Sequence, residues 1–163
     1  NYPVVQAENN DYYLHRLPDG SQNAAGTLFM DFQNASDLSD WNSIIYGHNM
    51  KNGTMFGSLK KVLDSSWRKN EENMTISLDL PTGSYKFKIF SIYKVDYTTD
   101  YLVTKFHSKS SKEDFINMIT KRSIFNSGIN VGLDDKILTL STCTGSNNRR
   151  LVVHAVLVKE GEE

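Results

Sequence analysis

The sequence has a single cysteine, Cys143, so an internal disulfide is excluded. No apolar run approaches the roughly 18 residues that a membrane-spanning helix needs. The charges nearly cancel, with a formal net charge of −1, so the chain lacks the basic footprint of a nucleic-acid-binding protein. Repeats and low-complexity tracts are also absent. At 163 residues, with 39% hydrophobic and 23% charged residues, the chain is expected to form one globular domain over residues 1–163. The lone thiol fits a reducing compartment, or an exported enzyme that needs it.

Short apolar and alternating runs, separated by turn residues, predict a mainly β protein. Strands are expected at residues 26–32, 41–46, 74–80, 85–93, 137–143 and 151–158. Helices are expected at 55–63 and from 110 to about 122, whereas residues 97–104 read equally as a loop or an irregular strand. This pattern predicts a β-barrel or sandwich with inserted helices.

Cys143 ends the apolar, β-branched run 137–143. A polar loop with a glycine follows it, and then the pair Arg149-Arg150 precedes the next predicted strand. A thiol beside such a loop and two cations is well placed to be exposed and to have negative charge stabilised next to it. The alternative is a small buried core residue, because free cysteine is among the most buried residue types.

A thiol nucleophile needs a base or ion-pair partner and a group that stabilises the oxyanion of acyl transfer. Among the four histidines, His48 is the best candidate because, like Cys143, it follows a predicted strand, and strand ends can meet at one rim of a barrel. His154 lies inside a predicted strand and is expected to be structural. His15 and His107 lie in polar stretches and are expected to be solvated.

Arginine carries a permanent charge and five donors, which suit an oxyanion or a substrate carbonyl. Adjacent strand residues point to opposite faces, so only one of Arg149 and Arg150 should reach Cys143. A solvated basic turn is the alternative for this pair. One cysteine and scattered histidines offer no metal-ligand spacing, so neither a metal nor a cofactor is expected.

Longer motifs in the chain resemble those of class B sortases. The segment NSIIYGHNMKNGTMFGSL at residues 42–59 is similar to their histidine motif, and LTLSTC at 138–143 with RLVV at 150–153 is similar to their TLxTC and arginine motifs. Residues 10–14 and 101–106 also resemble class B segments, so the resemblance spans almost the whole chain. It implies a mainly β fold, a sortase-type eight-stranded β-barrel with a few peripheral helices.

The resemblance further implies a cysteine transpeptidase of Gram-positive bacteria. Such enzymes cleave an NPxTx-like C-terminal sorting signal after its threonine through a thioacyl-enzyme. They then transfer the protein to an amine of peptidoglycan or of its lipid-linked precursor. The implied location is the extracytoplasmic face of the membrane, with an anchor that would precede Asn1. Nucleic acid is not an expected partner.

Carried over position by position, the resemblance makes Cys143 the nucleophile and His48 the general acid/base. Arg150 becomes the oxyanion- or substrate-orienting arginine, since Leu-Val-Val follows it in the family's manner. The positions that match substrate-contacting segments are Asn10, Leu14, Tyr101, Leu102 and Ser141. The chain departs from many class B members directly after the cysteine, where Thr144 and Gly145 stand in place of an acidic residue.

Two other functions stay open from the residues alone. One is a cysteine peptidase or hydrolase of another type, although His48 precedes Cys143, which is the reverse of the papain-like order. The other is a non-catalytic wall-binding module, in which some of the eight tyrosines line a peptide or glycan groove. This second alternative predicts an unreactive Cys143.

Overall fold

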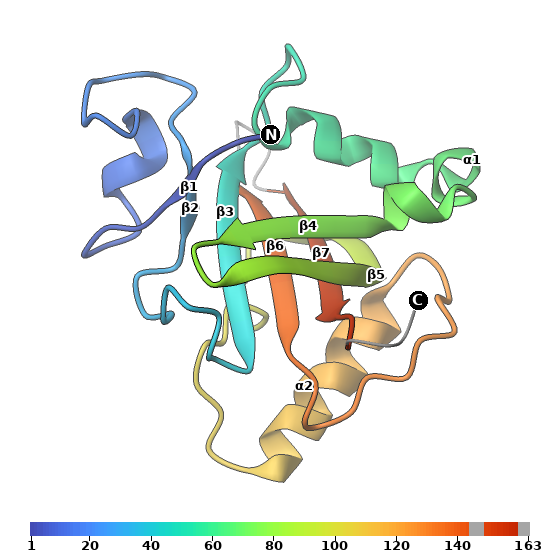
Figure 1. The fold of residues 1–163 in the computed structure, drawn as a ribbon. Helices are drawn as coiled ribbons and strands as arrows, with labels where there is room; N and C mark the ends of the chain where they lie inside the picture. Colours follow the sequence, from blue (N-terminus) through green and yellow to red (C-terminus); the bar gives the residue numbers. More distant parts are fainter. Residues whose placement is uncertain (144–148, 160–163) are drawn as a thin grey trace.

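The computed structural model describes residues 1–143 and 149–159, and its β-strands form one curled sheet (Figure 1). The sheet has seven strands in the order β1-β2-β3-β6-β7-β5-β4. Neighbours are antiparallel except for the parallel pairs β1–β2 and β3–β6. The strands are β1 (Val4–Val5), β2 (Leu28–Met30), β3 (Asn42–His48), β4 (Thr75–Leu80), β5 (Gly83–Asp96), β6 (Ile137–Cys143) and β7 (Arg149–Leu157).

The predicted mainly β fold with a few helices is confirmed, although the number of strands differs from the expected eight. The described residues form seven strands, and β1 and β4 are the two outer strands of the sheet, so it curls without closing. The ambiguous segment 97–104 contains no strand. Its interactions explain why, since the carbonyl of Val103 accepts a hydrogen bond from the Asn42 side chain, at 2.8 Å, rather than from a neighbouring strand.

Both predicted helices are present, the first in altered form and the second nearly as predicted. Residues 55–63 contain a 3₁₀ helix, Phe56–Leu63, which is followed by α1 (Ser65–Arg68). The second is α2 (Lys109–Arg122), which starts at a capping box in which Ser108 and Ser111 bond each other's backbone N–H. Two further 3₁₀ turns cover Tyr12–His15 and Glu71–Met74. Within the described ranges, no helix combines the length and apolar character needed to span a bilayer.

The central strands are buried on both faces. Leu138, Leu140 and Val153 belong to the larger core cluster on one face. On the other face, Phe115 and Ile119 of α2 pack against residues of β5, β6 and β7. The prediction of one wet face for residues 85–93 therefore holds only for the start of β5, because Ile89–Tyr93 are buried without alternation.

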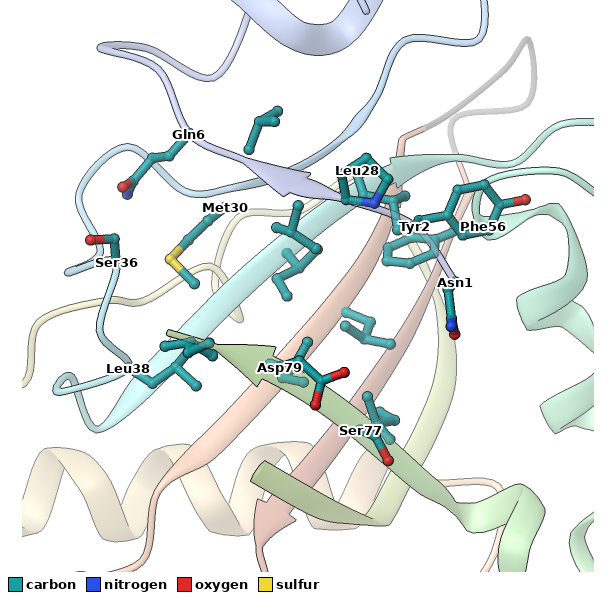
Figure 2. Close-up of a pocket in the computed structure, with 18 residues that line it drawn as sticks. Asn1, Tyr2, Gln6, Leu28, Met30, Ser36, Leu38, Phe56, Ser77 and Asp79 are labelled. Atoms are coloured by element: carbon teal, nitrogen blue, oxygen red, sulfur yellow. The ribbon is translucent and has the colours of Figure 1, made fainter. Parts of the chain in front are cut away.

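A groove of about 660 Å³ lies between the two outer edges of the sheet (Figure 2). Leu28 and Met30 of β2 line one part of it, and Leu78 of β4 lines another. Ile45 and Leu140 also line it. Side chains alternate along a strand, so Tyr46 and Ser141, which follow Ile45 and Leu140, point to the other face of the sheet.

Candidate active site

The parallel pairing of β3 with β6 brings His48 and Cys143 together. Each is the last residue of its strand, and the register aligns them as direct partners. The two strands therefore end side by side, although the segments lie far apart in the sequence. The sequence predicts His48 just after its strand, whereas it is the final strand residue. The side chain of Cys143 lies outside the described residues.

The start of β7 lies at the same end of the sheet. β7 runs antiparallel to β6, with Ser141 opposite Val152. Cys143 is two residues after Ser141 and Arg150 is two before Val152, so the two meet where this ladder ends. The backbone N–H of Leu151 also donates to Thr142 Oγ1, at 2.9 Å. The histidine, cysteine and arginine motifs thus converge on one end of β3, β6 and β7.

The two arginines lie in different surroundings. Arg149 is exposed, and its Nε donates to Asp96 Oδ1 at 2.9 Å, in an ion pair whose side chains are 67% and 82% exposed. Arg150 is half-buried, and its guanidinium carbon lies 5.0 Å from the centre of the Tyr97 ring. Its Nε is buried with no acceptor among the described residues. An unpaired buried donor of this kind is available to a ligand or water.

The imidazole of His48 has a fixed partner. Its Nε2 lies 2.5 Å from the carbonyl oxygen of Leu14, which can only accept, so Nε2 carries the hydrogen. Nδ1 is then the nitrogen left to exchange a proton with another group. The ring of His15 lies beside that of His48, with 5.3 Å between ring centres. The segment around Leu14 therefore helps to set both the tautomer and the orientation of His48.

A model of the sortase domain matches residues 1–158. The chain belongs to the sortase family. Sortase B of Listeria monocytogenes is 36% identical over 96% of the chain and 64% of the relative. Sortase B of Staphylococcus aureus is 34% identical over 98% of the chain and 66% of the relative. The chain thus spans just under two thirds of the length of these curated relatives.

The solved structures agree with this assignment. The crystal structure of sortase B from B. anthracis in complex with AAEK1 matches with a TM-score of 0.90 and 40% identity, covering 98% of this chain and 74% of that one. These relatives are all sortases B, so the class B resemblance and the sortase fold are confirmed.

Packing around Gly47 explains why the sortase domain has a glycine directly before His48. A Cβ at this position would overlap side-chain atoms of Leu28 and Phe56. Only glycine therefore lets the end of β3 pack against these residues. The glycine of the Tyr-Gly-His sequence is thus a packing requirement that fixes the backbone next to the imidazole.

A buried carboxylate contacts the β3 residue two positions before His48. Asp31 accepts from the hydroxyl of Tyr46 at 2.7 Å and from the amide of Asn10 at 3.0 Å. Burial and the neighbouring carboxylate raise the pKa of Tyr46 above its ordinary range. Tyr46 is two residues before His48, so both side chains lie on one face of β3. The sequence analysis did not identify Asp31 or Tyr46, although this two-residue spacing was a usable signal for Tyr46.

The five predicted substrate-contacting positions differ in their burial and in their contacts. Leu14 and Leu102 are half-buried and pack against the cluster that contains Tyr46, on the His48 face of the sheet. Asn10 uses both ends of its amide within the protein, since its Oδ1 also accepts from the backbone of Phe32 at 2.9 Å. This set therefore has two apolar side chains on the side of His48 and one structural amide.

Tyr101 and Ser141, the other two positions, do not reach a surface. Both are 0% exposed, and their hydroxyl oxygens are 2.8 Å apart. This hydrogen bond ties residues 97–106 to β6, two residues before Cys143. In this conformation the two side chains are placed to support the site from behind rather than to contact a substrate.

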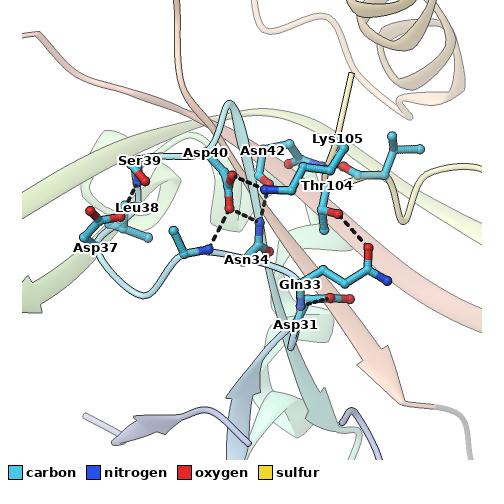
Figure 3. A network of polar contacts seen from close by, with 12 residues as sticks. Asp31, Gln33, Asn34, Asp37, Leu38, Ser39, Asp40, Asn42, Thr104 and Lys105 are labelled. Carbon is cyan, nitrogen blue, oxygen red and sulfur yellow. Dashed lines mark hydrogen bonds and ion pairs between the residues drawn. The ribbon is translucent and has the colours of Figure 1, made fainter. Parts of the chain in front are cut away.

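A polar network fixes the rest of the same segment against the start of β3 (Figure 3). Lys105 Nζ forms an ion pair with Asp40 at 2.8 Å, and Asp40 also accepts from Asn34 at 2.9 Å. Burial alone would raise the pKa of Asp40, but the hydrogen bonds from Lys105, Asn34 and the Ala35 backbone lower it overall. Thr104 adds a hydrogen bond to Gln33 at 3.2 Å. Residues 104 and 105 are therefore bonded to the loop that precedes β3, and Val103 is bonded to Asn42 of β3 itself.

The prediction that His154 is structural is confirmed. It is 0% exposed and bonds Tyr93 at 2.9 Å and Thr139 at 2.8 Å. Burial lowers its pKa to about 3, so it stays neutral. His15 and His107 are exposed, as expected. Within the part of the chain that the structure describes, no three acidic, cysteine or histidine side chains cluster in a way that could hold a metal.

Proposed function

We propose that this domain is a cysteine transpeptidase that cleaves a sorting-signal peptide and transfers the acyl fragment to a cell-wall amine. The observation that carries the proposal is the register of β3 and β6, which pairs His48 with Cys143 at the shared end of two parallel strands. Arg150 begins the neighbouring strand at that end. The family relatives support the same reaction.

In the proposed reaction, the thiolate of Cys143 attacks the carbonyl carbon of the signal's threonine, and the carbonyl oxygen becomes an oxyanion. Arg150 stabilises this oxyanion with its charge and free donors. The carbon–nitrogen bond then breaks, and protonated His48 gives its proton to the leaving amine. The product is a thioester on Cys143.

The second half of the reaction reverses these roles. An amine attacks the thioester, neutral His48 takes its proton, and the sulfur of Cys143 leaves as the thiolate. The acceptor class is a peptidoglycan amine or its lipid-linked precursor, and the donor is an NPxTx-like signal. This acceptor puts the proposed reaction on the extracytoplasmic face of a Gram-positive membrane, with the enzyme anchored there.

The two arginines provide a matched pair of variants. Arg150→Ala should lower kcat for cleavage of an NPxTx peptide by roughly 10²–10³-fold, the loss expected for one oxyanion donor. Arg149→Ala should change kcat little, because Arg149 is paired with Asp96 in an exposed ion pair. Equal losses in the two variants would contradict the role of Arg150.

Adding an amine acceptor to the same assay separates transfer from hydrolysis. A transpeptidase should give a peptide–amine product at the expense of the free acid. A wild-type domain that gives only the free acid at saturating amine would instead be a hydrolase.

A further inference from the structure

Tyr97 is the aromatic side chain that contacts Arg150. The guanidinium carbon lies 5.0 Å from the centre of the ring, within the range of a cation–π contact. The tyrosine is 59% exposed, whereas the aromatic residues nearest to it in the sequence, Tyr93 and Tyr101, are 2% and 0% exposed. Isolated exposed aromatic residues are common on protein surfaces, so its exposure alone assigns it no role.

The segment that carries Tyr97 is anchored on both sides. Just before it, the backbone of Asp96 is held opposite Arg149 in the ladder between β5 and β7. Just after it, Asp100 receives two hydrogen bonds from Arg122 of α2, at 2.8 and 2.6 Å. The next residue is the buried Tyr101, bonded to Ser141. Such anchors restrict where the Tyr97 ring can lie, so its contact with Arg150 is built into the fold.

The other surroundings of Arg150 indicate what its contact with the Tyr97 ring can do. Among the described residues, no carboxylate pairs with its guanidinium, and its Nε has no acceptor. A carboxylate would hold the guanidinium but would also offset the positive charge that an oxyanion needs. An aromatic face attracts the cation through its quadrupole and uses none of its N–H donors. The ring can therefore orient Arg150 and leave both charge and donors available.

We propose that Tyr97 is a positioning residue that holds the guanidinium of Arg150 in line with the developing oxyanion. This inference rests on the proposed function, because it assigns Tyr97 a role only through Arg150. It predicts that the aromatic face of Tyr97 matters and that its hydroxyl does not. It also predicts a loss mainly in kcat, since the oxyanion forms only in the reaction and not in the bound peptide.

The test compares Tyr97→Phe, Tyr97→Leu and wild type in cleavage of an NPxTx peptide. Phe should retain kcat within about twofold. Leu, which is apolar but has no π face, should lower kcat by about three- to thirtyfold with a smaller change in KM. A Leu variant equal to wild type would overturn the inference, and so would a Phe variant as impaired as Leu.

Two controls isolate the effect. Tyr85→Leu makes the same change at the opposite end of β5 and should leave kcat unchanged. Alkylation of Cys143 by iodoacetamide forms no oxyanion, so its rate should be the same in wild type and Tyr97→Leu. A slower alkylation in Tyr97→Leu would mean that the ring supports the thiol site generally, which would overturn the specific link to Arg150.

Different results would contradict the proposed function and the role of Tyr97. If wild type neither cleaves the peptide nor forms an adduct on Cys143, the proposed function is wrong and the inference fails with it. If wild type cleaves the peptide and Tyr97→Leu matches it, only the inference is wrong.

Discussion

Acidification to pH 5 should destabilise the fold through His154. Its imidazole is fully buried between Tyr93 and Thr139, and burial lowers its pKa to about 3. In the unfolded chain the pKa is about 6.5. Below pH 6.5 the unfolded chain therefore binds a proton that the folded protein does not accept. The stability linked to this group is fully present above pH 6.5 and is lost as the pH falls toward 3.

The size of the effect follows from these two pKa values. Each pH unit below 6.5 costs at most about 1.4 kcal/mol, so moving from pH 7 to pH 5 should lower the free energy of unfolding by about 2 kcal/mol. Urea denaturation of wild type and His154→Gln at pH 7, 6 and 5 measures this change. His154→Gln should be less stable than wild type at pH 7. Between pH 7 and pH 5, however, its free energy of unfolding should lack the fall of about 2 kcal/mol that His154 causes.

Equal pH dependence in the two proteins would refute the reasoning. So would an NMR titration of the folded wild type in which the ring of His154 protonates above pH 5, because the predicted loss of stability requires a ring that stays neutral in the folded protein.

Further predictions concern the packing behind the site. Gly47→Ala should destabilise the protein by about 1–3 kcal/mol and lower peptide cleavage, because the added methyl overlaps the side chains of Leu28 and Phe56 next to His48. Gly132→Ala, which meets only the Asp135 carboxylate, at 3.3 Å, is the control, and equal thermal shifts in the two variants would contradict this explanation. Ser141→Ala should cost about 1–3 kcal/mol in urea denaturation, because it leaves the buried hydroxyl of Tyr101 without its partner. Adding Tyr101→Phe to Ser141→Ala should recover part of that loss, and a double variant showing the full sum of the two single losses would argue against a coupled pair.

The local pattern of the chain predicted much of the sheet. The run 137–143 was placed correctly because an apolar, β-branched stretch that ends at a polar loop has few alternatives to a buried strand. Because side chains alternate along a strand, the sequence also predicted that only one of Arg149 and Arg150 would reach Cys143. That Arg149 is the one paired with a carboxylate could not be predicted, because nothing local indicates that Asp96 lies opposite Arg149 across β5 and β7.

Long-range pairing was the part that the local pattern left open. The meeting of His48 with Cys143 depends on a parallel pair of strands from distant segments, and composition and periodicity do not encode such a register. Burial of Asp31 was equally hidden, since nothing in the predicted strand 26–32 marks its aspartate as buried rather than solvated. Tyr101 and Ser141 matched substrate-contacting segments, yet each satisfies the other's hydroxyl inside the core.

The most direct test of the whole account is mass spectrometry of the domain after incubation with an NPxTx peptide, with and without an amine acceptor. The account predicts an acyl adduct on Cys143 without the amine, a peptide–amine product with it, and neither in a folded Cys143→Ala variant. Cleavage that persists in Cys143→Ala, or a wild-type Cys143 that stays unmodified by both the peptide and a small alkylating reagent, would contradict it.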